Sequence, residues 1–126
     1  MVIPPEVRSA LTEHAEAEAP NEACGLLALR DSVAERYLPG TNAAASPYRF
    51  ELEFPPEEWM DLWDEGYEIA IFHSHPSSPP RPSRTDVENI GQWAGYPYVI
   101  LNTRTGELAA WRIDDGAVEP LELSAG

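Results

Sequence analysis

The first segment of the chain has the period of a helix. Two prolines open it at residues 4 and 5, and apolar side chains follow at three- and four-residue intervals, at Val7, Ala10, Leu11 and Ala15. Proline is favoured in the first turn of a helix, and this spacing places the apolar side chains on one face. We therefore expect a helix that ends near residue 20 and buries that face.

Most of the remaining chain has the patterns of strands. A nearly continuous apolar run at residues 23–29 predicts a buried strand, and a short polar turn leads to a return strand at residues 33–38. Residues 39–47 have the composition of a loop. Further strands are predicted at residues 48–54, 67–72, 97–102, 107–113 and 117–123.

Two more helices are expected between these strands. One begins at Pro55 and ends at Gly66, with Trp59 and Trp63 on one face as core residues. The other covers residues 83–93. The mixed order of helices and strands predicts an α/β or α+β fold, with one central mixed β-sheet flanked by helices.

The composition of the chain limits the number of domains and the kinds of partner that we expect. The chain has 126 residues, 43% of them apolar, so we expect one domain over residues 1–126. Its formal net charge of −14 disfavours nucleic acid and anionic membranes as partners. No apolar run is long enough to span a membrane and the first residues lack a signal-peptide pattern, which predicts a cytoplasmic protein. Oligomeric state is not predicted.

Two histidines follow directly on the apolar run at residues 67–72. His73 and His75 are separated by one residue, so in a strand both imidazoles project from the same face. They can then bind one metal ion together, although a pair of nearby histidines is also common as a hydrogen-bonded structural feature. Since Cys24 is the only cysteine, a metal site here must use histidines and carboxylates.

Asp86 can complete such a site. It lies in the first turn of the predicted third helix, beyond the proline-rich loop at residues 76–82, so the chain can double back toward the histidines. Catalytic zinc usually has three protein ligands and one open position. Ser83 and Asp86 also match a helix-capping pattern, and we expect that bonding its own backbone would compete with metal binding by Asp86.

Glu22 and Cys24 are the other candidates for chemistry. Glu22 stands just before the first predicted strand, where a carboxylate near a metal can take a proton from water. Taken alone, Glu22 is one acid among many, and an exposed surface role is the favoured interpretation. An alternative is a cysteine hydrolase in which Cys24 is the nucleophile and His14 or His73 is the base. The apolar residues around Cys24 favour an inert buried thiol instead. His14 reads as a structural residue of the first helix.

Together these residues resemble the JAMM/MPN metallopeptidase family. The family pattern is a glutamate, then H-x-H, seven residues, a serine, two residues and an aspartate. This chain has Glu22, then His73 and His75, the loop 76–82, Ser83 and Asp86, with every spacing matched. The residues around Glu22 (PNEACGLL) and around the histidines (IFHSHP) are also similar, and the likeness extends over residues 1 to 120.

The resemblance implies a cytidine-deaminase-like fold and a mechanism. One Zn²⁺ per chain would be held by His73, His75 and Asp86 and would polarise a water. Glu22 would act as general base, and Ser83 would donate a hydrogen bond to the oxyanion. The implied substrate is a peptide or isopeptide bond after the C-terminal Gly-Gly of a ubiquitin-like protein.

The short chain is similar to stand-alone prokaryotic members of the family, which act on ubiquitin-like sulfur-carrier proteins. The bound carrier tail would lie extended and add to a sheet. Three alternatives remain at this point: a general small peptidase or isopeptidase, a catalytically silent MPN scaffold that binds ubiquitin-like proteins, and the Cys24 hydrolase.

Overall fold

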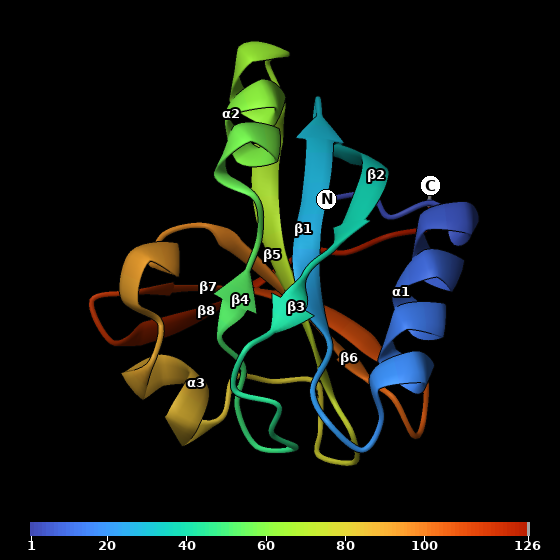
Figure 1. Cartoon of the computed structure of the whole chain (residues 1–126), viewed down its shortest axis with the longest axis vertical. Helices are drawn as coiled ribbons and strands as arrows, with labels where there is room; N and C mark the ends of the chain where they lie inside the picture. The colour runs from blue at the N-terminus through green and yellow to red at the C-terminus, as the bar shows by residue number, and fades with distance from the viewer. Residues whose placement is uncertain (126) are drawn as a thin grey trace.

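The computed structural model describes residues 1–125, which form helices on both sides of one large sheet (Figure 1). The chain begins with α1 and continues through two strand hairpins before the second helix. The elements, in chain order, are α1 (Pro5–Glu18), β1 (Cys24–Arg30), β2 (Val33–Pro39), β3 (Thr41–Asn42), β4 (Leu52–Glu53), α2 (Pro56–Asp64), β5 (Glu68–His75), α3 (Arg84–Glu88), the 3₁₀ helix η1 (Gly91–Trp93), β6 (Pro97–Asn102), β7 (Leu108–Asp114) and β8 (Ala117–Leu121).

The main sheet has six strands in the order β2-β1-β5-β6-β7-β8. Strands β5 and β6 are parallel, and every other neighbouring pair is antiparallel. A parallel pair needs a crossover connection, and here the chain makes it through α3 and η1. This mixed sheet flanked by helices confirms the fold class predicted from the sequence.

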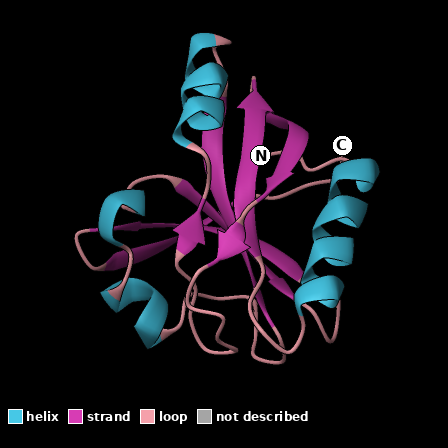
Figure 2. Cartoon of the chain, in the orientation of Figure 1, coloured by secondary structure: helices cyan, strands magenta, loops and turns pink. Residues whose placement is uncertain are grey.

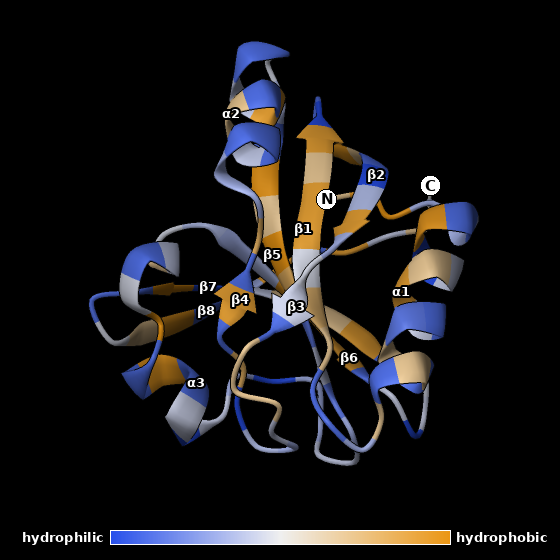
Figure 3. Cartoon of the chain, in the orientation of Figure 1, coloured by the Kyte–Doolittle hydropathy of each residue, from blue (hydrophilic) through white to orange (hydrophobic). Residues whose placement is uncertain are grey.

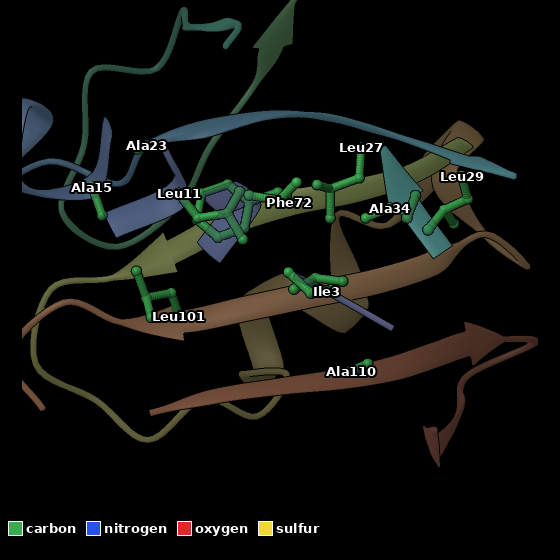
Figure 4. Packing of buried hydrophobic residues seen from close by; sticks show 13 residues of the cluster. Ile3, Leu11, Ala15, Ala23, Leu27, Leu29, Ala34, Phe72, Leu101 and Ala110 are labelled. Carbon is green, nitrogen blue, oxygen red and sulfur yellow. The ribbon is translucent and has the colours of Figure 1, made fainter. Parts of the chain in front are cut away.

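The helices bury the two faces of the sheet in two separate hydrophobic clusters. Helix α1 covers one face, where Leu11 packs with Leu27 and Phe72 (Figure 4). Helix α2 and the α3–η1 segment cover the other face, where Leu62 packs with Ile71 and Ile100. Figure 3 shows the result as apolar central strands β1 and β5 between helices whose outer faces are polar.

The alternation of side chains along β5 sets the position of the candidate site. Phe72 belongs to the α1 cluster, whereas Ile71 belongs to the cluster under α2. By the same alternation His73 and His75 project on the α2 and α3 side, at the end of the strand. Figure 2 shows long loops gathered at this end of the sheet, so the histidines lie where loops can approach them.

The structure corrects four details of the structure predicted from the sequence. The strand expected at residues 48–54 is only two residues long, and the loop expected at residues 39–47 contains β3. The helix expected at residues 83–93 is divided into α3 and η1, because Gly91 has a φ of +48° that interrupts helical geometry. Trp59 packs against the α2-side cluster as expected, but Trp63 is 46% exposed.

The N-terminus joins the two edges of the large sheet. Val2 forms isolated parallel bridges with Val33 of β2 and with Ser124, which follows β8. The outer strands are therefore tied together beside α1. Among the helices of residues 1–125, none combines the length and the apolar character that crossing a bilayer requires.

Candidate metal and catalytic site

The end of β5 carries three buried polar residues with different partners. His73 and His75 are almost fully buried, and so is Ser74 between them. Ser74 points to the opposite face, where its hydroxyl accepts a hydrogen bond from Ala23 N–H at 2.8 Å and its own N–H donates to Ala23 O at 3.0 Å. The residue between the histidines thus ties the start of β1 to β5 and holds Glu22, the neighbour of Ala23, beside the histidine pair.

Helix α3 delivers Asp86 to the same place. Ser83 and Asp86 form a capping box: Asp86 N–H donates to Ser83 Oγ at 3.0 Å, and Ser83 N–H donates to Asp86 Oδ2 at 2.9 Å. Atom Oδ2 also lies 3.3 Å from His73 Nε2 and 3.0 Å from His75 Nε2. One oxygen of Asp86 thus faces both its own backbone and the histidines, and the expected competition between capping and metal binding would fall on this atom.

The three side chains form a group whose geometry suits one metal ion. The Nε2 atoms of His73 and His75 are 3.1 Å apart, so the separations within the triangle are 3.1, 3.3 and 3.0 Å. Ligand atoms about 2.0–2.1 Å from a tetrahedral zinc ion lie about 3.3 Å from one another. The nitrogen and oxygen atoms of this group can therefore hold a divalent ion with little movement.

The loop after β5 fixes the orientation of His75. Its Nδ1 lies 2.8 Å from the carbonyl oxygen of Pro79. Because a carbonyl only accepts hydrogen bonds, Nδ1 carries the proton, and a neutral His75 presents the lone pair of Nε2 to the cluster. The next carbonyl, that of Pro80, accepts a hydrogen bond from Trp111 Nε1 at 2.8 Å. Trp111 of β7 thus anchors the proline-rich loop that orients His75.

Aromatic rings enclose His73. The ring of Phe50 stacks on its imidazole with centroids 4.6 Å apart, and the ring of Tyr98 lies 4.9 Å away. Burial lowers the pKa of His73 despite the opposing effect of Asp86, so the imidazole stays neutral, as metal ligation requires. Burial also acts to lower the pKa of His75, but hydrogen bonds to Asp86 and to the Pro79 carbonyl raise it overall.

The carboxylate of Asp86 is held in its ionised form. Burial alone would raise its pKa, but the two imidazoles and the Ser83 N–H outweigh that effect and hold the pKa well below its usual range. The group therefore combines two nitrogen donors with one permanently charged oxygen donor.

Glu22 lies at the edge of this group with a free oxygen atom. The residue is 2% exposed, and its Oε1 is 3.9 Å from His73 Nε2. Among buried side-chain atoms of the described chain, only Glu22 Oε1 and His73 Nδ1 have no hydrogen-bond partner. Burial raises the pKa of Glu22 to about 8, and the His75 imidazole offsets only part of that rise. At that pKa the carboxyl group is largely protonated at neutral pH, and a divalent cation bound beside it would lower the pKa and free the carboxylate to accept a proton.

Ser83 lies at the entrance to the group, at the start of α3. Its Oγ accepts the capping hydrogen bond from Asp86 N–H, which leaves the hydroxyl hydrogen available to a ligand. The structure therefore brings together all five residues singled out from the sequence: Glu22, His73, His75, Ser83 and Asp86.

The alternative nucleophile, the thiol of Cys24, does not ionise near neutral pH. Cys24 is buried, and burial together with the charges of Glu22 and Glu18 raises its pKa to about 12. His14 is hydrogen-bonded to the hydroxyl of Tyr37 at 2.6 Å, as suits a structural residue of α1. A thiol that remains protonated at neutral pH is a poor nucleophile.

Sequence patterns did not indicate the supporting residues Ser74, Phe50 and Trp111. Ser74 occupies the variable position of the H-x-H pair, and the other two belong to β-rich segments where aromatic residues are common. Their roles depend on contacts between distant segments. A signal was available only for Ser74, because a polar residue inside a buried strand requires a partner.

Comparisons with known proteins place the site in context. A family model described as prokaryotic homologs of the JAB domain matches residues 4–114. A CysO-cysteine peptidase of Mycobacterium tuberculosis is 36% identical over 133 residues, which cover 98% of this chain and 90% of that protein. A desampylase of Haloferax volcanii is 39% identical over 99 residues, which cover 71% of this chain and 68% of that protein.

Solved structures agree on the fold. A protein of Desulfitobacterium hafniense superimposes with a TM-score of 0.80 at 28% identity, covering 97% of this chain and 90% of that one. A JAB1/MPN domain protein of Archaeoglobus fulgidus superimposes with a TM-score of 0.60 at 19% identity, covering 98% of this chain and 95% of that one. At 19% identity, the likeness to the Archaeoglobus fulgidus protein shows a shared fold.

Proposed function

Since this chain belongs to the prokaryotic JAB-domain family and is a peptidase by its relatives, we propose that it is a zinc enzyme acting on ubiquitin-like sulfur-carrier proteins. It hydrolyses the peptide or isopeptide bond that follows the C-terminal Gly-Gly of the carrier. The observation that carries this proposal is the triangle of His73, His75 and Asp86 with the unpartnered oxygen of Glu22 beside it. Two nitrogens and one carboxylate oxygen are a ligand set typical of catalytic zinc.

The side chains around the triangle divide the hydrolysis between them. His73, His75 and Asp86 would hold a Zn²⁺ ion, which would supply the Lewis acidity that polarises the attacking water and the scissile carbonyl. Glu22 accepts a proton from that water at Oε1 as the new carbon–oxygen bond forms, and it returns the proton to the leaving nitrogen as the carbon–nitrogen bond breaks. Ser83 donates its hydroxyl hydrogen to the developing oxyanion, a contribution of about 3 kcal/mol for one donor.

A groove beside β4 suits an extended tail. It is lined by residues 49–52 on one side and residues 89–93 on the other, with a volume of about 360 Å³. Strand β4 pairs with β3 in a sheet of two strands, which leaves its other edge for a tail to pair with. Phe50 in this groove stacks on His73, so a tail along β4 leads to the metal group.

The same groove continues into a second, more aromatic one. Its volume is about 470 Å³, and it shares Leu52, Gln92 and Trp93 with the tail groove. The ring of Trp59 lies 5.5 Å from that of Trp93, and neighbouring Met60 is 57% exposed. Exposed apolar surface of this kind marks a protein interface. We assign it to the folded body of the carrier, whose tail then runs along β4.

The proposal is tested by mass spectrometry of a small ubiquitin-like carrier that carries extra residues after Gly-Gly. We expect the zinc-loaded protein to remove those residues and leave a Gly-Gly end, and the chelator-stripped protein to leave the carrier intact. Cleavage at other positions in unrelated peptides would indicate a general peptidase. Binding of the carrier without cleavage in any metal state would indicate a scaffold and contradict the proposal.

A further inference from the structure

The main chain of Glu22 is held by a loop outside the large sheet. Its N–H donates to Ser46 O at 2.9 Å, and its carbonyl accepts a hydrogen bond from Asn42 Nδ2 at 2.9 Å. Its carboxylate oxygen Oε1 has no hydrogen-bond partner among residues 1–125. The loop at residues 42–46 therefore holds the main chain of Glu22 from one side, while the bonds between Ser74 and Ala23 hold the segment from the other.

Asn42 uses its whole side-chain amide in this loop. Its Nδ2 donates to Glu22 O and, at 3.1 Å, to Arg49 O. Its Oδ1 accepts from Ala44 N–H and from Glu51 N–H, both at 3.0 Å. An asparagine amide offers two donor hydrogens and two acceptor lone pairs, so all four are occupied, and all four partners are backbone groups.

These four bonds connect the Glu22 segment to the strand beside the groove. Arg49 and Glu51 flank Phe50, the residue that stacks on His73 and lines the tail groove. Asn42 itself belongs to β3 and pairs with Leu52 of β4. One side chain therefore links the main chain of Glu22 directly to the segment that leads into β4, along which a tail would bind.

From this geometry we propose that Asn42 is a positioning residue, which holds the general base Glu22 in register with the substrate-binding strand β4. It acts through main-chain hydrogen bonds and touches none of the three metal-binding side chains. Aspartate cannot reproduce the pattern, because it supplies acceptors only and would turn a charge toward the carbonyls of Glu22 and Arg49. The inference rests on the proposed role of Glu22.

The test compares Asn42→Asp with the control Thr12→Asp, which likewise replaces a donor by a charged acceptor. Thr12 donates its hydroxyl to a backbone carbonyl, that of Arg8 at 3.1 Å, but it lies on α1, outside the tail groove and the metal group. We expect Asn42→Asp to lower kcat by about 10- to 100-fold, the range for a small displacement of a catalytic group. Zinc affinity, measured by competition with a chelator, should stay within about twofold of the wild type, since the metal-binding side chains are untouched. The control should keep both quantities.

A double-variant cycle separates positioning from general support of the fold. Glu22→Asp shortens the base and keeps a measurable rate, and in that background Asn42→Asp should cost much less than in the wild type. Equal losses in both backgrounds, or a parallel loss of zinc, would overturn the inference. So would a kcat for Asn42→Asp equal to that of the control.

Two further measurements keep the outcome interpretable. If Asn42→Asp does not fold, the wild-type protein decides, because both Nδ2 hydrogens of Asn42 must be protected from exchange with solvent in its NMR spectrum; free exchange would refute the proposal. Turnover by Glu22→Gln would instead remove the general base and with it the proposed function. Failure of the inference and failure of the function thus give different results.

Discussion

Glu22 Oε1 lies 3.9 Å from His73 Nε2, inside the protein and without a hydrogen-bond partner in the described part of the chain. At that distance the carboxylate is outside bonding range of the imidazole, yet it is close enough for a single water to lie between it and an ion on the histidines. In the proposed mechanism this position separates two tasks, with metal binding assigned to three side chains and proton transfer to a fourth.

Glu22→Gln tests that separation. The amide has nearly the same shape but cannot accept the proton from water, so turnover should fall by about 100- to 10,000-fold. Metal analysis should still find the ion, because Glu22 is outside the triangle. A variant that keeps its turnover would contradict the role of Glu22 as base.

Trp111→Phe tests the support of His75. The change removes the hydrogen bond to Pro80 O and loosens the loop whose Pro79 carbonyl orients the imidazole. We expect zinc affinity to fall about tenfold, the lower end of the range for residues that support metal ligands, as measured by chelator competition. Trp63→Phe is the control, since Trp63 is 46% exposed on α2, and an equal fall in both variants would refute the supporting role.

Cys24→Ala distinguishes a metal mechanism from a thiol mechanism. The thiol is buried and its pKa is raised to about 12, so it is protonated at neutral pH and its loss should change kcat by less than about twofold. The variant should lose about 1 kcal/mol of unfolding free energy through the small cavity that it leaves, as denaturant titration would show. Complete inactivation of a folded, zinc-loaded variant would support the cysteine hydrolase instead.

The lowered pKa of His14 predicts that the stability of the fold depends on pH. Burial lowers its pKa and Glu18 opposes that effect only in part, so below about pH 6.5 the unfolded chain binds the proton more readily than the folded one. The contribution of His14 to stability is therefore lost as the pH falls below that value. In denaturant titrations of zinc-loaded protein at pH 7.5 and 5.0, His14→Gln should lose less stability than the wild type. Equal losses would show that His14 does not titrate differently on folding.

The sequence predicted the elements with strong periodicity and the residues with fixed spacing. The helix at residues 5–18 and the strand at residues 97–102 were predicted because their burial patterns are local. The strand at residues 48–54 was overestimated because Arg49 O and Glu51 N–H bond to the side chain of Asn42, and of these two residues only Glu51, through its O, bonds to a neighbouring backbone group, Ala43 N–H.

The residues of the candidate site were likewise predicted only in part. The motif identified five residues that the fold brings together, since a metal group needs particular donors at particular spacings. Asn42 and Trp111 were missed because each acts on carbonyl groups of a distant segment. Any residue has a carbonyl group, so the identities of the acceptors carry no pattern, and only the folded chain shows which donor reaches them.

The most direct test of the central claim is anomalous X-ray scattering at the zinc edge from crystals of the zinc-loaded protein, with His75→Ala as the control. We predict one peak per chain between His73 Nε2, His75 Nε2 and Asp86 Oδ2, within reach of a water that also contacts Glu22, and no such peak in the variant. A zinc-loaded crystal with that position empty, or with the ion bound by other side chains, would contradict the account.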